Sequence, residues 1–316
     1  MNCKKAIDNY LKYAKLKLKN STYEINERKI KKYILPYFKN KNIYDLSTKD
    51  YLDWQMYINQ FNFSYNYKSS LHYCFCDFLN YCMLFYDLPR NVAKKVGNFR
   101  NDDLQTPGNI WTLEEFNQFI EVVDNPIYHA LFNFLFFTGV RKGEALALTF
   151  NDIDFENQTV KIYKTITRYY KNGQKIITSP KTKSSNRIIC IDSSLLTELK
   201  YLKMYYNSLF ENFDNDFYVF GGTDSIPWTT LKREKDFYCS LSGVKQIKIH
   251  EFRHSHACLL FQNNVPIEDV SRRLGHSSLS MTMDTYLKYL PGNEKRVIST
   301  LNNLRLLNNH QKNSLK

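Results

Sequence analysis

The stretch YHALFNFLFFTGVRKGEALAL, residues 128–148, carries a long apolar run directly into an arginine. Residues 128–140 are nearly all apolar and predict a buried helix, and Gly139 is of the residue type that commonly ends helices. Arg141 follows two positions later, where the chain should leave the core and a second helix should begin. A guanidinium delivered to the end of a buried helix points to an anionic partner.

The composition favours the same kind of partner. The chain has 316 residues, a formal net charge of +13, 43% hydrophobic residues and 24% charged residues. Its length predicts about two domains. A positive surplus of this size favours a polyanion, with nucleic acid as the first choice and an anionic membrane surface as the second. A basic protein with neither partner remains an alternative. No apolar run reaches the roughly 18 residues that a membrane span requires.

Residues 1–90 are predicted to form a small helical bundle. Ser21 with Glu24 has the spacing of a capping box, after which apolar residues recur at helical spacing until Pro36. A second helix should start with Ser47 as its cap, and residues 68–87 predict a third, strongly apolar helix. Residues 91–110 show no sustained period and contain a Pro-Gly pair, so they are interpreted as a linker.

A second domain is predicted over residues 111–306, followed by a polar tail at 307–316. It opens on a capping box formed by Thr112 and Glu115. Three β-branched runs, QTVKIYKTITRYY, QKIITS and RIICI, then predict a three-stranded antiparallel meander, whose first turn contains Asn172-Gly173. Further helices should start near Ser193, His250, Pro266 and Ser278. The predicted fold class is therefore mainly α, with one small antiparallel sheet.

The cysteines indicate a reducing compartment. There are seven, an odd number, and their spacing shows no disulfide framework, so we expect a cytoplasmic protein. His72, Cys74, Cys76 and Cys82 form the one cluster that resembles a metal site. Their spacing lacks the paired C-x-x-C of structural zinc sites, and buried thiols are the favoured interpretation. No metal and no cofactor are expected.

Four separated stretches contain side chains suited to a phosphodiester. They hold Arg141 with Glu144, Lys181 in PKTKSSNR, His250 with Arg253 in HEFRHSH, and His276 with Tyr286 in LGHSSLSMTMDTYLKY. Two arginines can clamp the non-bridging oxygens of one phosphate, and Glu144 can hold a guanidinium or an imidazole in place. Lys181, at a hairpin tip, is suited to protonate a leaving alkoxide. Each residue alone is common in a basic protein, so the prediction rests on their combination.

The order Arg, Lys, His-x-x-Arg, His, Tyr resembles the tyrosine recombinase, or phage integrase, family. TGVRKGEALAL looks like the first arginine box of that family, and SPKTKSSNRIICI resembles its catalytic-lysine hairpin. HEFRHSHACLL resembles its His-x-x-Arg box. The final box has Tyr286 ten positions after His276. The resemblance covers residues 111–295, whereas residues 1–90 are similar only in kind to the helical, SAM-like core-binding domain of the family.

The resemblance implies a site-specific DNA recombinase or integrase that works through a 3′-phosphotyrosyl intermediate. Tyr286 would attack the phosphate, and Arg141, Arg253 and His276 would stabilise it. His250 would assist proton transfer, and Lys181 would protonate the leaving 5′-oxygen. The resemblance implies no need for ATP or a metal. The implied partners are double-stranded DNA at specific sites, further copies forming a tetramer on DNA, and accessory DNA-bending or directionality factors, with no membrane.

Several alternatives remain open at this point. A Xer-like dimer resolvase and a type IB topoisomerase share the tyrosine and arginine chemistry, and a non-catalytic DNA-binding accessory factor could keep the same fold. His254 lies four positions from His250 and is expected to serve packing or the DNA backbone rather than catalysis. Because helical patterns begin near residue 1, no additional N-terminal arm-binding domain is expected.

Overall fold

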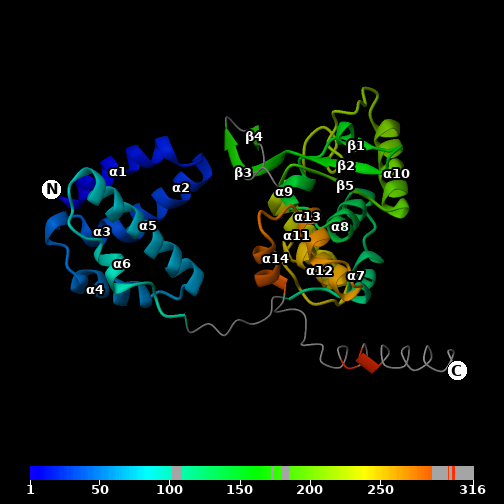
Figure 1. Cartoon of the computed structure of the whole chain (residues 1–316). Helices are drawn as coiled ribbons and strands as arrows, with labels where there is room; N and C mark the ends of the chain where they lie inside the picture. The colour runs from blue at the N-terminus through cyan, green and yellow to red at the C-terminus, as the bar shows by residue number, and fades with distance from the viewer. Residues whose placement is uncertain (102–108, 172–173, 179–184, 287–297, 299–300, 303–316) are drawn as a thin grey trace. The chain divides into compact units, whose positions relative to one another are not determined.

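The computed structural model describes residues 1–101, 109–171, 174–178, 185–286, 298 and 301–302. The chain forms two compact units, Met1–Gln105 and Thr106–Lys316 (Figure 1). Asn172-Gly173, the Pro107-Gly108 pair, Lys181 and the tail at 307–316 lie outside the described residues. No helix among the described residues has the length and apolar character that crossing a membrane would take.

The first unit is a bundle of helices. Its elements are α1 (Cys3–Lys17), α2 (Asn20–Lys29), the π-helical η1 (Ile30–Ile34), α3 (Leu35–Phe38), the 3-10 turn η2 (Ile43–Asp45), α4 (Thr48–Asn59), α5 (Tyr65–Phe85) and α6 (Val92–Val96). Aromatic rings fill its core. Phe38 stacks on Phe75 with ring centroids 4.8 Å apart, and Trp54 lies 5.4 Å from Phe75. These large apolar surfaces hold α3, α4 and α5 together.

In the first unit, the sequence correctly predicts the start of α4 at its capping residue. Ser47 accepts a hydrogen bond from the Asp50 backbone, which confirms it as the cap, and Asp50 bonds back to the Ser47 backbone, so the two form a full capping box. The capping box at Ser21 is wrong, because α2 already begins at Asn20 with Lys19 as its N-cap. The helical path also continues past Pro36, which occupies the first turn of α3, where a missing backbone donor is tolerated.

The predicted linker differs from the structure at its start. Residues Val92–Val96 form α6, which Asn91 caps by accepting from the backbone of Lys94. Val92, Ala93 and Phe99 are buried in the core of the first unit. The sequence pattern missed this helix because five residues are too short to show a period.

The second unit consists mainly of helices and carries a small sheet. Its helices are α7 (Leu113–Ile120), α8 (Pro126–Thr138), α9 (Lys142–Ala145), the 3-10 turn η3 (Phe150–Asp152), α10 (Ser193–Leu209), α11 (Trp228–Ser242), α12 (Glu251–Gln262), α13 (Ile267–Leu274) and α14 (Leu279–Tyr286). The apolar helix α8 contacts α7, α9, α10 and α12. Its buried phenylalanines therefore form the centre of the second core, as the opening stretch of sequence predicts.

The strands confirm a small three-stranded antiparallel sheet, although its members differ from the predicted meander. The sheet contains β1 (Ile153–Asp154), β2 (Thr159–Ile162) and β5 (Arg187–Cys190), with Val160 opposite Ile189. The strands β3 (Thr165–Lys171) and β4 (Gln174–Thr178) form a separate two-stranded sheet. The first β-branched run thus forms two strands, β2 and β3. The paired strands β3 and β4 lie in the sequence between β2 and β5, which pair with each other. The mainly α fold with a small antiparallel sheet is confirmed.

Candidate active site

Arg141 stands at the start of α9, directly after the turn that ends α8. Gly139 has a φ of 65°, in the left-handed region, and caps α8 as its sequence predicts. The Arg141 backbone N–H donates to Glu144 Oε2 at 3.0 Å, and its guanidinium donates to Glu144 Oε1 at 2.9 Å. The Glu144 carboxylate therefore fixes both the backbone and the side chain of Arg141. Arg141 remains partly open to solvent, whereas Glu144 is buried.

Arg187 is a second partner of Glu144 that the sequence analysis missed. Its guanidinium donates to Glu144 Oε2 at 3.0 Å, to the carbonyl of Ser185 at 3.0 Å and to the carbonyl of Arg273 at 2.7 Å. Burial by itself raises the pKa of Glu144, but attraction and hydrogen bonding to Arg187 and attraction to Arg141 outweigh it and lower the pKa below its usual value. Glu144 is therefore ionised at neutral pH between two guanidiniums.

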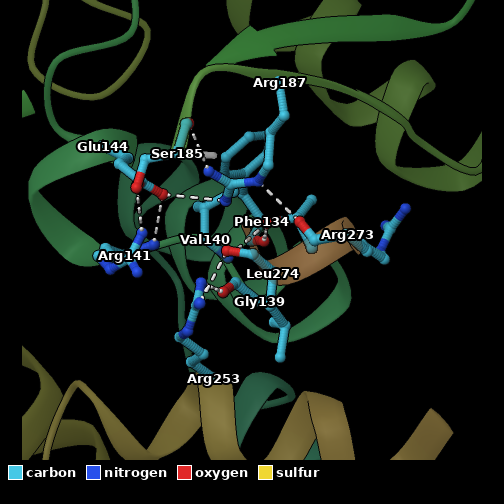
Figure 2. A network of polar contacts seen from close by, with 11 residues as sticks. Phe134, Gly139, Val140, Arg141, Glu144, Ser185, Arg187, Arg253, Arg273 and Leu274 are labelled. Atoms are coloured by element: carbon cyan, nitrogen blue, oxygen red, sulfur yellow. Dashed lines mark hydrogen bonds and ion pairs between the residues drawn. The ribbon is translucent and has the colours of Figure 1, made fainter. Parts of the chain in front are cut away.

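Arg253 approaches the same region from α12. Its side chain is buried, and it donates to the carbonyl of Gly139 at 2.8 Å and to the carbonyl of Leu274 at 2.7 Å (Figure 2). Burial and the nearby Arg141 charge lower the pKa of Arg253 to about 10, so it stays charged at pH 7. An arginine has five N–H donors, and the carbonyl contacts occupy two of its nitrogens without exhausting them. Donors therefore remain for a phosphate.

His250 caps the start of α12, three positions before Arg253. Desolvation, Arg253, Arg141 and Lys142 lower its pKa to about 4, and its exposure to solvent moderates that shift. The imidazole is therefore neutral at pH 7. Its ring lies edge-on to that of His254, with centroids 4.9 Å apart. His254 in turn lies 5.3 Å from the ring of Tyr286, which agrees with a packing role.

His276 follows the end of α13, and Tyr286 is the last residue of α14. The His276 ring is nearly parallel to that of Tyr286, and His276 Nδ1 lies 2.7 Å from Thr282 Oγ1. Desolvation followed by the charges of Arg253 and Arg141 lowers the pKa of His276 to about 4. Tyr286 is 1% exposed and packs in a cluster with Ala257, Cys258, Val270 and Leu274.

Five of the six predicted catalytic side chains thus gather in one region. The charge of Arg141 acts on Arg253, and both arginines act on the imidazoles of His250 and His276. Arg253 and Tyr286 also interact electrostatically. Lys181, the sixth, lies outside the described residues. Tyr286 is the most deeply buried of the three side chains contributed by His250, His276 and Tyr286.

A basic cavity of about 1000 Å³ opens beside His250. The lysines that line it are Lys142, Lys232, Lys235 and Lys248. The Lys142 ammonium lies 4.1 Å from the centroid of the Trp228 ring, a cation–π contact that orients it. Asp236, which pairs with Lys232 and Lys235, and Glu251 also line the cavity, so its positive charge comes from an excess of lysines over carboxylates.

A different cavity of about 830 Å³ lies between α8 and α10 and contains no predicted site residue. His129 and Asn133 meet Glu198 there, with Asn133 donating to the carboxylate at 3.2 Å. This cavity is therefore lined by a cluster of one histidine, one amide and one carboxylate. No arginine is among the described residues that line it, so it lacks the guanidiniums that suit a phosphate. Among the described residues, no group of three or more His, Cys, Asp or Glu side chains is placed to hold a metal ion.

Residues 111–291 match the phage integrase family, and residues 4–59 match the N-terminal SAM-like domain of phage integrases. The chain belongs to the phage integrase family, the tyrosine recombinases. This confirms the resemblance drawn from the sequence motifs and assigns the chain to a class of DNA recombinases. The match to the SAM-like domain also confirms the predicted nature of the first unit.

Individual relatives extend over most of the chain. It is 27% identical to the ICEBs1 integrase of Bacillus subtilis (strain 168) over 302 residues, which cover 93% of this chain and 81% of the relative. The Tn1549 transposon integrase, solved in complex with a circular intermediate DNA, has the same fold with a TM-score of 0.76 at 16% identity, covering 96% of this chain and 99% of that one. The lambda integrase tetramer bound to a Holliday junction gives a TM-score of 0.64 at 16% identity, covering 88% and 78%.

Proposed function

We propose that this chain is a site-specific DNA recombinase that cuts and rejoins strands through a 3′-phosphotyrosyl link at Tyr286. The observation that carries the proposal is that two guanidiniums act on two neutral imidazoles, while Arg253 and His276 also interact with Tyr286. Arg141 and Arg253 come from segments more than 100 positions apart, yet both act on the environments of His250 and His276. Such a set matches the charge of a phosphate in its pentacoordinate transition state.

The proposed step conserves the number of phosphate ester bonds. The phenol oxygen of Tyr286 bonds to phosphorus while the bond from phosphorus to the 5′-oxygen breaks. His250, neutral at pH 7, accepts the phenol proton, and Lys181 donates a proton to the leaving 5′-oxygen. Arg141, Arg253 and His276 hold the non-bridging oxygens. The 5′-hydroxyl of a partner strand reverses the step, so neither ATP nor a metal takes part.

DNA is the proposed substrate because the site is surrounded by positive charge. The lysine-lined cavity beside His250 offers a path for the phosphates next to the one that is cut. We further propose that four copies assemble on two DNA sites, in the cytoplasm where DNA is available. The likeness of this fold to the lambda integrase tetramer on a Holliday junction supports that assembly.

The decisive experiment traps the covalent intermediate. Duplex DNA from both sides of the encoding gene is nicked close to candidate cleavage positions, so that the released fragment diffuses away and the protein stays attached. We expect the wild-type chain to form the adduct and Tyr286→Phe to bind DNA without forming it. Tyr206→Phe is the matched control, since it removes the hydroxyl of another buried tyrosine in the same unit and should leave the adduct intact. An adduct in Tyr286→Phe would place the nucleophile elsewhere.

A second substrate tests the acid. Lys181→Ala should cleave normal DNA slowly and recover on DNA whose leaving 5′-oxygen is replaced by sulfur, because a thiolate leaves without a proton. Equal slowness on both substrates would remove Lys181 from that role.

A further inference from the structure

Arg187 is buried and has no place in the reaction proposed above. Its side chain is 7% exposed, and each of its three guanidinium nitrogens already donates to an acceptor within the protein. Three acceptors in different directions hold this guanidinium inside the protein, so its geometry suits a structural role. The presence of Arg187 beside Arg141 and Arg253 therefore calls for a role other than phosphate binding, and the groups that accept its hydrogen bonds indicate that role.

The first link runs from Arg187 to Arg141 through one carboxylate. Glu144 Oε2 accepts from the Arg187 guanidinium and from the Arg141 backbone, while Oε1 accepts from the Arg141 guanidinium. Arg187 thus holds the carboxylate that holds Arg141. Without Arg187, Arg141 would be the one arginine among the described residues still hydrogen-bonded to this buried carboxylate, which would draw that guanidinium more strongly toward itself.

The second link runs from Arg187 to Arg253 through the end of α13. Arg187 Nε donates to the carbonyl of Arg273, and the next carbonyl along the chain, that of Leu274, accepts from Arg253 (Figure 2). These carbonyls belong to the last turn of a helix, where the backbone acceptors lack helical partners. Arg187 therefore fixes the backbone that fixes the second guanidinium.

We propose that Arg187 is a positioning residue that sets the relative placement of Arg141 and Arg253 for a single phosphate. The inference rests on the proposed recombinase function. A lysine cannot replace it fully, because a single ammonium nitrogen cannot reach three acceptors that lie in different directions around a planar fork. The charge alone is therefore insufficient, and the geometry of the guanidinium carries the role.

The test compares two substrates that differ in one charge at the cut phosphate. One duplex carries the normal phosphate, and the other carries a methylphosphonate, in which a methyl group replaces one non-bridging oxygen. The neutral methylphosphonate has less need of two aligned guanidiniums. We expect Arg187→Met to bind DNA within about twofold of wild type, yet to cleave the normal substrate about 100-fold more slowly, the size of effect that a misplaced catalytic group produces. On the methylphosphonate substrate, Arg187→Met should cleave only about threefold more slowly than wild type.

Two further variants complete the design. Arg187→Lys should recover the normal rate only in part. Arg272→Met is the matched control, because it removes the same charge from an exposed side chain on α13 and should leave both rates unchanged. The ratio of the two rates within one preparation does not depend on the folded fraction. Thermal melting identifies a variant that fails to fold, and in that case Arg187→Lys, with its smaller change, decides the test through the same ratio.

The outcomes separate the two proposals. A wild-type chain that forms no adduct on the mapped DNA site overturns the proposed function. A wild-type chain that cleaves, with Arg187 variants that are equally slow on both substrates or as fast as wild type on both, overturns the positioning role alone.

Discussion

The imidazole of His276 lies almost parallel to the phenol of Tyr286, with ring centroids 6.1 Å apart and planes inclined by 8°. The imidazole is itself held from its other side, where Nδ1 meets the buried hydroxyl of Thr282. When this hydroxyl donates to Nδ1, the proton of the neutral ring resides on Nε2, which can then donate to a phosphate oxygen. With the hydroxyl as donor, Thr282 would select the form of His276 that the proposed reaction needs.

Thr282→Val should slow covalent complex formation while leaving DNA affinity unchanged. Valine has nearly the same shape as threonine but lacks the hydroxyl, so His276 loses its orienting partner. We expect a decrease of about tenfold in the cleavage rate, the lower range for a misdirected acid–base group. Thr282→Ser retains the hydroxyl and should stay close to wild type in the same single-turnover assay. A valine variant as fast as the serine variant would contradict this role.

His256 should make the protein less stable in acid. It is buried, and desolvation followed by the charge of Arg273 lowers its pKa to about 3. An unfolded chain would protonate this imidazole near pH 6.5, so between pH 6.5 and 3 the unfolded state binds the extra proton. The free energy of unfolding therefore falls as the pH drops through that window. His250 and His276 shift in the same direction.

His256→Gln retains an acceptor for the Arg273 guanidinium, which donates to His256 Nε2 at 3.2 Å, and removes the titration. At pH 5 the His256 contribution amounts to roughly 2 kcal/mol. Urea unfolding at pH 7 and pH 5 should show a loss of stability that is smaller by about this amount in the variant. An unchanged difference between the two pH values would rule out His256 as the source.

Gly143→Ala should destabilise the second unit even though alanine favours helices. A Cβ atom at this position would lie 2.5 Å from Thr165 Oγ1 and 2.8 Å from the carbonyl of Ile166. The gain in helix propensity is about 1 kcal/mol, whereas overpacking costs about 1–3 kcal/mol. Chemical denaturation should show a net loss. Combining the change with Thr165→Ala should restore only part of it, because the second contact is with the backbone; complete recovery would contradict this geometry.

Lys248→Ala should weaken DNA binding and flatten its dependence on salt. Lys248 lines the cavity beside His250, where a neutralised phosphate would release a counterion. The slope of log affinity against log salt should decrease by about one unit in a fluorescence titration. Lys200→Ala on α10 removes an exposed lysine that does not line the cavity and should leave the slope unchanged. Identical slopes for both variants would indicate that DNA does not pass through the cavity.

Sequence patterns identified the features that short segments determine. The caps at Ser47 and Thr112 and the left-handed end of α8 at Gly139 were predicted correctly, because each depends on residues within one helical turn. The sheet was predicted in kind but not in membership. Val160 pairs with Ile189 across an intervening hairpin, and strand pairing over such a separation leaves no local signal.

The candidate active site divides in the same way, into features that sequence motifs reveal and features that only the fold reveals. The residue types at Arg141, His250, Arg253, His276 and Tyr286 were recognisable from their motifs, and the structure brings them together. The role of Arg187 was not recognisable, because it depends on burial against Glu144, 43 positions away, and on two backbone carbonyls. An arginine at the start of an apolar strand was the available clue. Backbone acceptors carry no signature in the sequence, so a contact of this kind emerges only from the fold.

If Tyr286 is the nucleophile, as proposed, its burial has a consequence for an enzyme that meets far more DNA than it should cut. A phenol with 1% of its surface accessible does not come within bonding distance of phosphates during random encounters along a chromosome. In the proposed reaction, release of the ring from its neighbours on α12 and α13 would have to precede attack on the phosphate. The work needed for that release is subtracted from the binding energy of the correct site, so the hidden phenol makes accidental nicking of the host genome rare.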